Sequence, residues 1–393
     1  MIRMQRFAAS HFFAFPIGAL VALIWANSQP ETYFVFARAW SFPVNDIGMV
    51  VFFALVTAEI VDAASPGGAL HTWRRMALPF VAAAGGLIGA TLAYFAYLRT
   101  GDELSVLSRG WPVAGAVDLV VGYVLVRGIF RRHAAIPFFL LLGVAADLCG
   151  AVVVELLYPV AEQHLAGIAL IAAGLGIAVA FRRAGVTTFW PFVLIAGAFS
   201  WWGFFLSGLH PAFALVPIIP FLVGHGQSRS TISHDDGLSR FDRIWSVPSQ
   251  VGLLLFALVN AGVMFKDIGT ATKAIAIAAL AGKPLGMLAA AGVAIACGLH
   301  LPRGVGRREL VVVALASSTA CSFGLFLATA AMAPGPVLAE TKVGALVTVV
   351  GALLALTAAR VLRIGRFSLK PASTRSRHDS ARRSAAPRSL AGV

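Results

Sequence analysis

Charged residues are scarce in this sequence. Aspartate, glutamate, lysine and arginine make up 12% of the 393 residues, whereas apolar residues make up 59%. A soluble globular domain carries about 25% charged residues, so the composition excludes an ordinary soluble domain. The alternation of apolar and polar residues that marks the strands of a membrane barrel is also missing. The remaining class is an all-α polytopic membrane protein.

Cysteine and cofactor motifs are equally sparse. The three cysteines, Cys149, Cys297 and Cys321, lie in apolar stretches and have no zinc-ligand spacing, which argues against a disulfide framework or a zinc site. Gly282-Lys283-Pro284 lacks the upstream glycine and the following Ser or Thr of a phosphate loop. We therefore expect no cofactor and no enzymatic activity.

Twelve apolar stretches are long enough, or nearly so, to cross a bilayer, which takes about 20 residues of helix. Within a few residues they are 11–28, 47–64, 76–98, 112–129, 134–158, 165–181, 187–206, 209–223, 247–265, 271–299, 308–333 and 341–362. We therefore predict about 12 transmembrane helices in one domain over residues 1–363. Residues 364–393, rich in Ser, Arg, Pro and Ala, predict a disordered basic tail.

The net charge of +14 reflects membrane topology and predicts no nucleic-acid partner. If the N-terminus is cytoplasmic, the inner loops hold 15 basic residues and the outer loops 6, and the C-terminal end from Arg360 onward adds 9 more inside. The positive-inside rule then places both termini in the cytoplasm. We predict a multi-pass protein of the bacterial cytoplasmic (inner) membrane, with membrane lipids as its surroundings.

Three ionisable residues lie deep in these apolar stretches: Asp118, Asp147 and Lys283. A charge at the centre of the bilayer costs at least about 2.5–3.5 kcal/mol. Such residues usually pair with one another and mark an ion or proton pathway. The sequence therefore predicts transport of protons or a small cation.

Segments three to five and ten to twelve form two sets of three helices. They are offset by seven spans, so their orientations are opposite, as in inverted repeats that place ion sites near the bilayer midplane. Segment four carries Pro112 and Gly115 before Asp118. Segment eleven carries a polar run that includes Ser318 and Thr319. Both segments are predicted to be interrupted helices.

The chain resembles the NhaA family of sodium/proton antiporters. The resemblance rests on LVALIWANS, VNDIGMVVFFALVTAEI, WPVAGAVDLVVGYVLV, AADLCGAVVVELLY, SGLHPAFALVPIIPFLVG, LVNAGV and GKPLGM, in the family's order over residues 18–333. It implies twelve helices in an inverted repeat, with segments four and eleven broken and crossing. It also implies a pair of aspartates in segment five that binds the cation, stabilised by an aspartate in segment four and a lysine in segment ten.

The chain departs from the family pattern at several positions. The aspartate pair appears as Ala146-Asp147, and Val117 replaces the threonine that usually precedes the segment-four aspartate. The loop at about 29–46 is too short for the β-hairpin through which family members dimerise. A homodimer is therefore an open expectation.

Asp147 is the residue expected to perform exchange. A buried carboxylate holds a proton or a transient Na⁺ or Li⁺, and exposure to the two sides in turn makes that competition an exchange. Lys283 needs a partner, with Asp147 first and Asp118 second by helix geometry. With one family acid missing, we expect weaker charge coupling, with electroneutral exchange as the hypothesis.

Other polar residues keep two interpretations each. Asp118 either attracts the ion or neutralises the positive ends of broken half-helices. Glu155 either lines an outer funnel or extends to the interface. Glu59 and Asp62 form an inner funnel or are solvated at the interface. His210 is a pH sensor or a structural residue.

Three further functions compete with proton/sodium exchange. Ala146 favours either exchange of another monovalent cation or a non-transporting sensor or assembly protein. An intramembrane aspartyl protease would also use two membrane aspartates. The flanks of Asp118 and Asp147 lack the Tyr-Asp and Gly-x-Gly-Asp contexts of such enzymes.

Overall fold

The structure, a computed structural model, describes residues 14–64, 73–99, 107–131, 133–157, 164–222, 237–302 and 304–368. Every regular element in these ranges is a helix or a helical turn. Seven helices are long and apolar enough to cross a membrane, and a bent pair of helices makes an eighth. The prediction of an all-helical, multi-pass membrane protein is therefore confirmed for the described residues.

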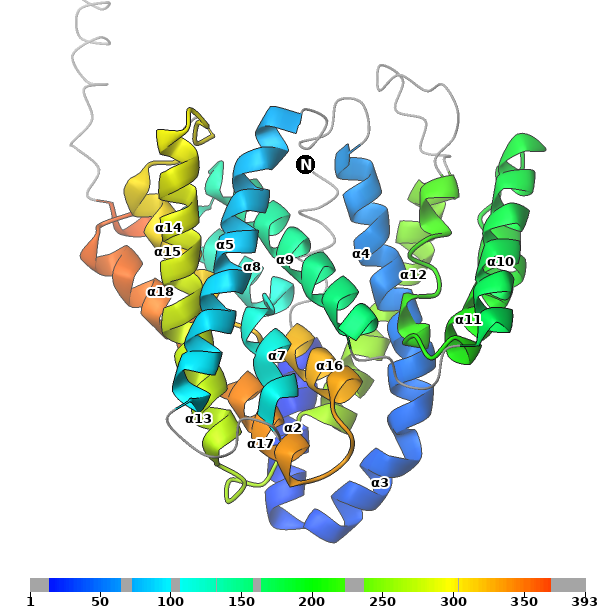
Figure 1. Cartoon of the computed structure of the whole chain (residues 1–393), viewed down its shortest axis with the longest axis horizontal. Helices are drawn as coiled ribbons and strands as arrows, with labels where there is room; N and C mark the ends of the chain where they lie inside the picture. Colours follow the sequence, from blue (N-terminus) through cyan, green and yellow to red (C-terminus); the bar gives the residue numbers. More distant parts are fainter. Residues whose placement is uncertain are drawn as a thin grey trace, which may run out of the picture.

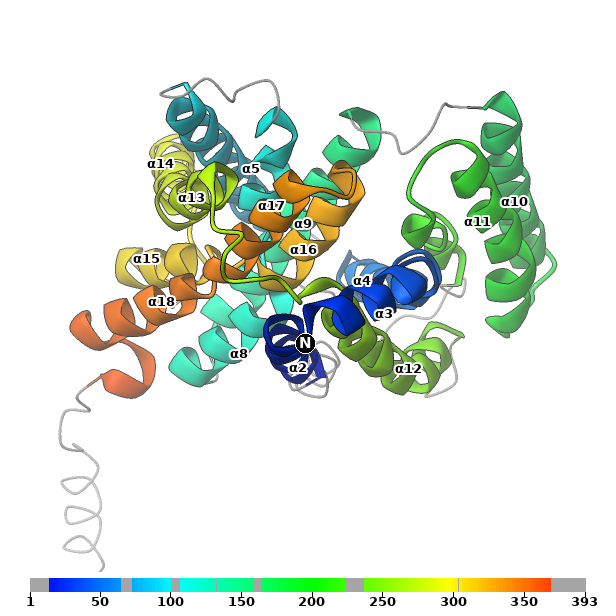
Figure 2. The same ribbon diagram turned by 90° about the horizontal axis from the view of Figure 1, so that it is seen from below.

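The helices form two groups that lie on opposite sides of the molecule (Figures 1 and 2). The larger helix group consists of α5 (Trp73–Leu98), α7 (Trp111–Gly115), α8 (Leu119–Phe130), α9 (Ala135–Leu157), α13 (Thr270–Ile277), α14 (Lys283–Ala296), α15 (Arg307–Ala316), α16 (Cys321–Ala331), α17 (Pro336–Val347) and α18 (Val350–Val361). The smaller helix group consists of α2 (Ala14–Ser28), α3 (Pro30–Phe42), α4 (Met49–Ala64), α10 (Leu165–Arg183), α11 (Gly197–Leu206) and α12 (Gly237–Asn260).

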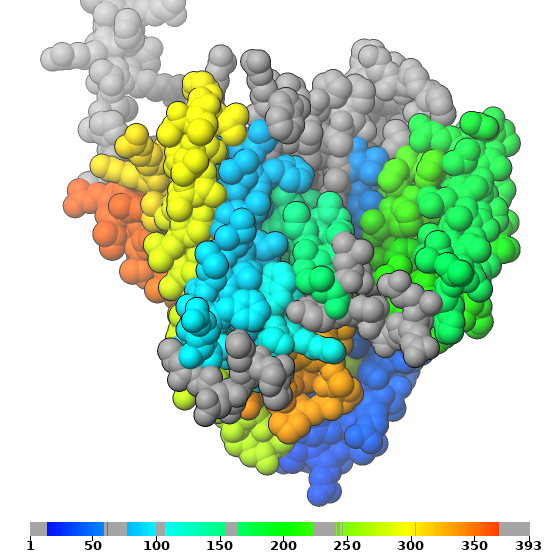
Figure 3. All heavy atoms as spheres, viewed as in Figure 1, coloured from blue at the N-terminus to red at the C-terminus, as the bar shows by residue number. Residues whose placement is uncertain are grey.

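The outer faces of the helices are apolar. Leu20, Ile88, Leu92, Leu165 and Val361 are each more than half exposed, and they belong to helices of both groups. In Figure 3, α5 and α14 form one side of the surface and α10 the other. An apolar exterior of this kind is stable only against lipid. It explains why the sequence has so few charges.

Glycines bring α5 and α14 into close contact. A Cβ atom at Gly89 would overlap the backbone of Gly282 and Gly286, and one at Gly286 would overlap the backbone of Gly85 and Gly89. Small residues of this kind allow membrane helices to approach each other closely. The π-helical turn Ala278–Gly282 leads directly into α14. This packing holds Lys283, the first residue of α14, against the centre of the larger helix group.

Both predicted interruptions are present. Residues Ala116 to Asp118 separate α7 from α8 within one span, Ser108–Phe130. Residues Ser317 to Ala320 separate α15 from α16, and the chain bends there by 48°. The prediction that segments four and eleven open near their centres is confirmed.

Two sequence-based assignments were wrong. The expected loop at about 29–46 is helical, because α3 continues through a π-helical turn (Pro43–Gly48) into α4. The expected span at 209–223 contains only two short 3-10 turns, Pro211–Phe213 and Ile219–Leu222. Pro211, Pro217 and Pro220 lack backbone N–H groups, which prevents a continuous helix there.

The described chain continues a short way past residue 363. Ile364 is buried, and Gly365–Phe367 forms a 3-10 turn that contacts α8. The packed chain therefore reaches Ser368. Residues 369–393, which hold most of the predicted tail, lie outside the described ranges.

The contact between α5 and α14 yields a stability prediction with a matched control. Gly286→Ala should lower the thermal stability of the purified protein, because overpacking a close helix contact costs about 1–3 kcal/mol. Gly292→Ala, on the same helix, places its Cβ in open space and should leave stability unchanged or raised. Heating in detergent followed by gel filtration measures both variants. Equal stability of the two variants would contradict the packing described here.

Candidate functional site

The two helix interruptions touch each other. The backbone N–H of Asp118, in the first interruption, donates to the carbonyl oxygen of Thr319, in the second, at 2.8 Å. Helices α7 and α16 lie side by side at this point near the centre of the molecule (Figure 1). Backbone groups that no longer bond within their own helix must find other partners when they are buried. Here the first interruption provides a donor and the second an acceptor, so that each satisfies a buried backbone group of the other.

The Asp118 carboxylate caps two helices at once. Its Oδ1 accepts from the N–H groups of Val120 and Val121 at the start of α8, each at 2.9 Å. Its Oδ2 accepts from the N–H of Ser322 at the start of α16, also at 2.9 Å. The side chain is fully buried. A negative charge at helix N-termini is stabilising, so this geometry favours the helix-neutralising interpretation of Asp118.

Lys283 lies at the opposite kind of helix end. Its Nζ donates to the carbonyl oxygen of Ala116, directly after the last residue of α7. A cation is stabilised at the C-terminal, negative end of a helix. Among the described residues, no carboxylate forms an ion pair with Lys283 within 4 Å. The direct pairing of Lys283 with Asp147 or Asp118, which helix geometry had suggested, is therefore absent from this conformation.

Asp147 is attached to the first interruption. It lies on α9, and its Oδ1 accepts from the backbone N–H of Val117 at 2.8 Å. The side chain is 8% exposed. The residue before it, Ala146, is buried and provides no oxygen ligand. The structure therefore brings Asp147, Asp118 and Lys283 to the same short stretch of open backbone, Ala116 to Asp118.

A cavity of about 440 Å³ borders Asp147. Among its described lining residues, the polar side chains are those of Thr57, Asp147 and Ser322. The rest of the wall is apolar and comes from both helix groups: Phe52, Phe53, Val56, Leu119, Val144, Leu148, Ala151, Val152, Ile171, Phe204, Leu209, Phe213, Val216, Pro217 and Phe323. The cavity leaves one carboxylate facing an otherwise apolar space, which is the setting in which a proton and a cation compete for the same oxygen atoms.

The polar run in segment eleven divides into two parts. Thr319 donates its hydroxyl to the carbonyl oxygen of Ala316 at 2.8 Å, and the Ser318 hydroxyl lies 3.5 Å from that of Ala314. Neither lines the cavity beside Asp147. Ser322 does line it, although the sequence had suggested Ser318 and Thr319 as accessory residues. Its place just after the break is the one signal in the sequence that pointed to it.

Of the remaining predicted accessory residues, only His210 has a described side chain, and it is not brought to Asp147. Glu59 lies in α4 and Glu155 in α9, but their side chains are outside the described part of the structure, as is that of Asp62. His210 lies outside the lining of the cavity, with its Nδ1 3.8 Å from Oδ1 of Asp46. The structure places His210 in a separate polar contact.

A second buried polar cluster was not expected from the sequence. The amide of Asn260, at the end of α12, donates to Oδ1 of Asn45 at 2.7 Å. Nζ of Lys342, on α17, lies 3.5 Å from Oδ1 of Asn260. The cluster thus connects the smaller helix group to the larger one. Its residues are too far apart in the sequence for any spacing pattern to have linked them.

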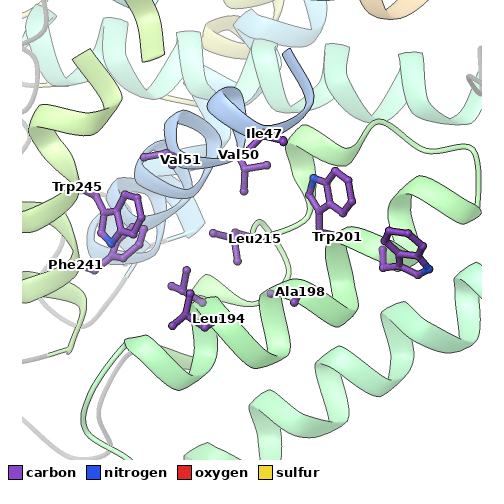
Figure 4. Close-up of a pocket in the computed structure, with 12 residues that line it drawn as sticks. Ile47, Val50, Val51, Leu194, Ala198, Trp201, Leu215, Phe241 and Trp245 are labelled. Carbon is purple, nitrogen blue, oxygen red and sulfur yellow. The ribbon is translucent and has the colours of Figure 1, made fainter. Parts of the chain in front are cut away.

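A second cavity of about 440 Å³ lies within the smaller helix group (Figure 4). Its lining is apolar and aromatic: Ile47, Val50, Val51, Val193, Leu194, Gly197, Ala198, Trp201, Trp202, Leu215, Phe241 and Trp245. No ionisable side chain is among these residues. This space therefore lacks the chemistry for ion exchange, and the candidate site remains the cavity beside Asp147.

Comparisons with known proteins identify the family of the chain. The profile of the family "Na+/H+ antiporter 1" matches residues 4–362. The chain is 35% identical to "Na(+)/H(+) antiporter NhaA 1" of Pelobacter propionicus, over 91% of this chain and 97% of the relative. It is 34% identical to "Na(+)/H(+) antiporter NhaA" of Desulfitobacterium hafniense, over 88% of this chain and 93% of the relative.

A third relative, "Na(+)/H(+) antiporter NhaA" of Geobacter sulfurreducens, is 33% identical over 89% of this chain and 95% of its own length. These matches extend across both helix groups and both interruptions. The resemblance seen in the sequence is confirmed, and it points to a transporter, not an enzyme. The chain belongs to the NhaA family of Na⁺/H⁺ antiporters.

Proposed function

We propose that this protein exchanges protons for Na⁺ or Li⁺ across the bacterial cytoplasmic membrane, with Asp147 as the shared site for the proton and the cation. One observation carries the proposal: among the side chains that the structure describes, Asp147 is the one carboxylate that lines the cavity beside the two interrupted helices. The family names of the relatives support the choice of ions.

The exchange follows from competition at one carboxylate. Oδ1 of Asp147 is held by the Val117 N–H, and this bond leaves Oδ2 for a proton or a cation. In the apolar cavity a neutral, protonated carboxyl is stable by itself, whereas the ionised form needs a cation. Release of the proton to one side and capture of the cation from the other then give antiport.

Alternating access in this proposal uses the inverted repeat expected for segments three to five and ten to twelve. In that arrangement about 12 spans place both termini in the cytoplasm, with the larger helix group moving against the smaller one. The cavity beside Asp147 is lined by residues of both groups. A relative movement of the groups therefore changes which side of the membrane reaches Asp147.

Lys283 acts in this mechanism without an ion pair. Its ammonium is held on the Ala116 carbonyl, and Asp147 is held on the N–H of the neighbouring Val117. The two charges are thus coupled through one peptide unit of the open backbone. Loss of the proton from Asp147 creates a negative charge that favours the ammonium, and a bound cation offsets that charge. This coupling requires no direct displacement of the lysine.

A second candidate is exchange of another monovalent cation, or loss of transport with retention as a sensor or assembly protein. Ala146 beside Asp147 favours these alternatives, because its buried methyl side chain cannot bind a cation. The intact arrangement of Asp118, Asp147 and Lys283 around the interruptions supports transport instead.

Asp147→Asn should abolish exchange, because an amide neither ionises nor balances the charge of a cation. Proton movement in everted membrane vesicles, followed by a pH-sensitive dye after addition of NaCl, LiCl or KCl, measures it. Glu31→Gln, which removes an exposed carboxylate on α3, is the control and should keep full activity. A sodium response that survives in Asp147→Asn, from protein shown to be inserted, would rule out this site.

Asp118→Asn should reduce stability more than Asp147→Asn does. An amide has one carbonyl oxygen and cannot accept from both helix starts, so at least one buried N–H loses its acceptor at a cost of about 1–3 kcal/mol. Thermal denaturation of the two purified variants in the same detergent gives the comparison. If the two variants melt together, Asp118 is not the cap that connects α8 and α16.

Exchange should be electroneutral, because a single carboxylate trades one proton for one monovalent cation. In proteoliposomes, a membrane potential imposed with potassium and valinomycin should leave the initial rate of sodium-driven proton movement unchanged. A rate that rises or falls systematically with the imposed potential would show net charge movement and would contradict the one-for-one exchange.

A further inference from the structure

A cation bound at Asp147 would need at least one further oxygen ligand from the cavity wall. Asp147 offers one free carboxylate oxygen, and a cation that leaves water needs further oxygen ligands. Most of the cavity wall is aliphatic or aromatic and offers none. In the part of the wall that the structure describes, two residues carry a neutral side-chain oxygen, Thr57 and Ser322.

We propose that the Ser322 hydroxyl is a direct ligand of the transported cation and, with Asp147, sets its selectivity. This inference rests on the proposed exchange at Asp147. Ser322 is 6% exposed and lines the same cavity as Asp147. Within the described part of the chain, its hydroxyl has no protein hydrogen-bond partner, whereas the Thr57 hydroxyl donates to the carbonyl oxygen of Phe53 at 2.7 Å. The Ser322 oxygen is thus the more available of the two.

The backbone of Ser322 is fixed where a ligand needs it. Its N–H donates to Oδ2 of Asp118 at 2.9 Å, and Asp118 is itself tied to the start of α8 through Val120 and Val121. The hydroxyl therefore belongs to a rigid junction of the two interrupted helices. Preorganisation of this kind is what distinguishes cations of different radius, because ligands that cannot move favour one ion size.

The start of a helix would normally repel a cation, since its free N–H groups carry partial positive charge. At α16 that field is offset by the Asp118 carboxylate, which accepts from the Ser322 N–H. The second interruption thereby becomes compatible with a cation at its edge. Because the Ser322 N–H is engaged by Asp118, it is not available to the cavity. The hydroxyl is then the polar group of Ser322 that can face a cation there.

Ser318 supplies a matched control. It lies in the same interruption and is fully buried, but it does not line the cavity, and its hydroxyl is directed at the Ala314 carbonyl oxygen. A serine-to-alanine change there removes the same hydroxyl from a similarly buried position. Only a change at Ser322 removes an oxygen from the space beside Asp147.

The experiment measures exchange in everted vesicles as a function of Na⁺ and Li⁺ concentration for wild type, Ser322→Ala, Ser322→Thr and Ser318→Ala. Ser322→Ala should raise the KM for Na⁺ about tenfold, which corresponds to about 1.4 kcal/mol of lost binding, and should change the ratio of the Na⁺ and Li⁺ KM values. The maximal rate should stay close to wild type. Ser322→Thr, which keeps a hydroxyl, and Ser318→Ala should both resemble wild type.

The outcomes separate this inference from the proposed function. If Ser322→Ala leaves both KM values unchanged while Asp147→Asn abolishes exchange, the ligand role of Ser322 is wrong and the exchange at Asp147 stands. The same holds if Ser318→Ala shifts the KM values as much as Ser322→Ala does. If wild type responds to neither Na⁺ nor Li⁺, both proposals fail. Equal melting temperatures of the two alanine variants exclude misfolding as the cause of a shift.

Discussion

The Asp118 carboxylate is the interaction on which the centre of this molecule depends. Two membrane helices are interrupted at the same place, and each interruption exposes backbone groups that neither lipid nor apolar side chains can satisfy. One buried side chain accepts three of the N–H groups, two from α8 and one from α16. Lys283 complements it with a cation on the carbonyl that follows α7. Opposite charges thus stabilise opposite helix ends, at positions fixed by the close packing of α5 on α14.

This arrangement holds the Asp147 side chain in place and still leaves one of its carboxylate oxygens free. Asp147 uses one oxygen to bind the Val117 N–H and faces a shared cavity with the rest of its side chain. Both oxygens of Asp118 accept from N–H groups at the helix starts, which fits the structural role proposed for it. The two aspartates, which look alike in the sequence, differ in the number of N–H groups that each one accepts.

Much of this was predictable from the sequence, and the limits have physical causes. Charge scarcity and long apolar runs gave the membrane class, and Pro112, Gly115 and the polar run after Ala316 gave both interruptions. The prediction of a span at 209–223 was wrong because it followed the high hydropathy and did not take account of three prolines that prevent a continuous helix. The partner of Lys283 and the place of Ser322 in the cavity wall were missed for another reason. In an interrupted helix the periodicity is lost, so neither the direction of a side chain nor the carbonyl it meets can be inferred from spacing.

The central claim is that one carboxylate, Asp147, exchanges one proton for one cation. Proton release from purified protein in weakly buffered detergent solution, recorded as NaCl is added, tests it most directly. The account predicts release of one proton for each sodium ion bound at saturation, and no release from Asp147→Asn. Release of two protons for each sodium ion, or release that persists in the variant, would contradict it.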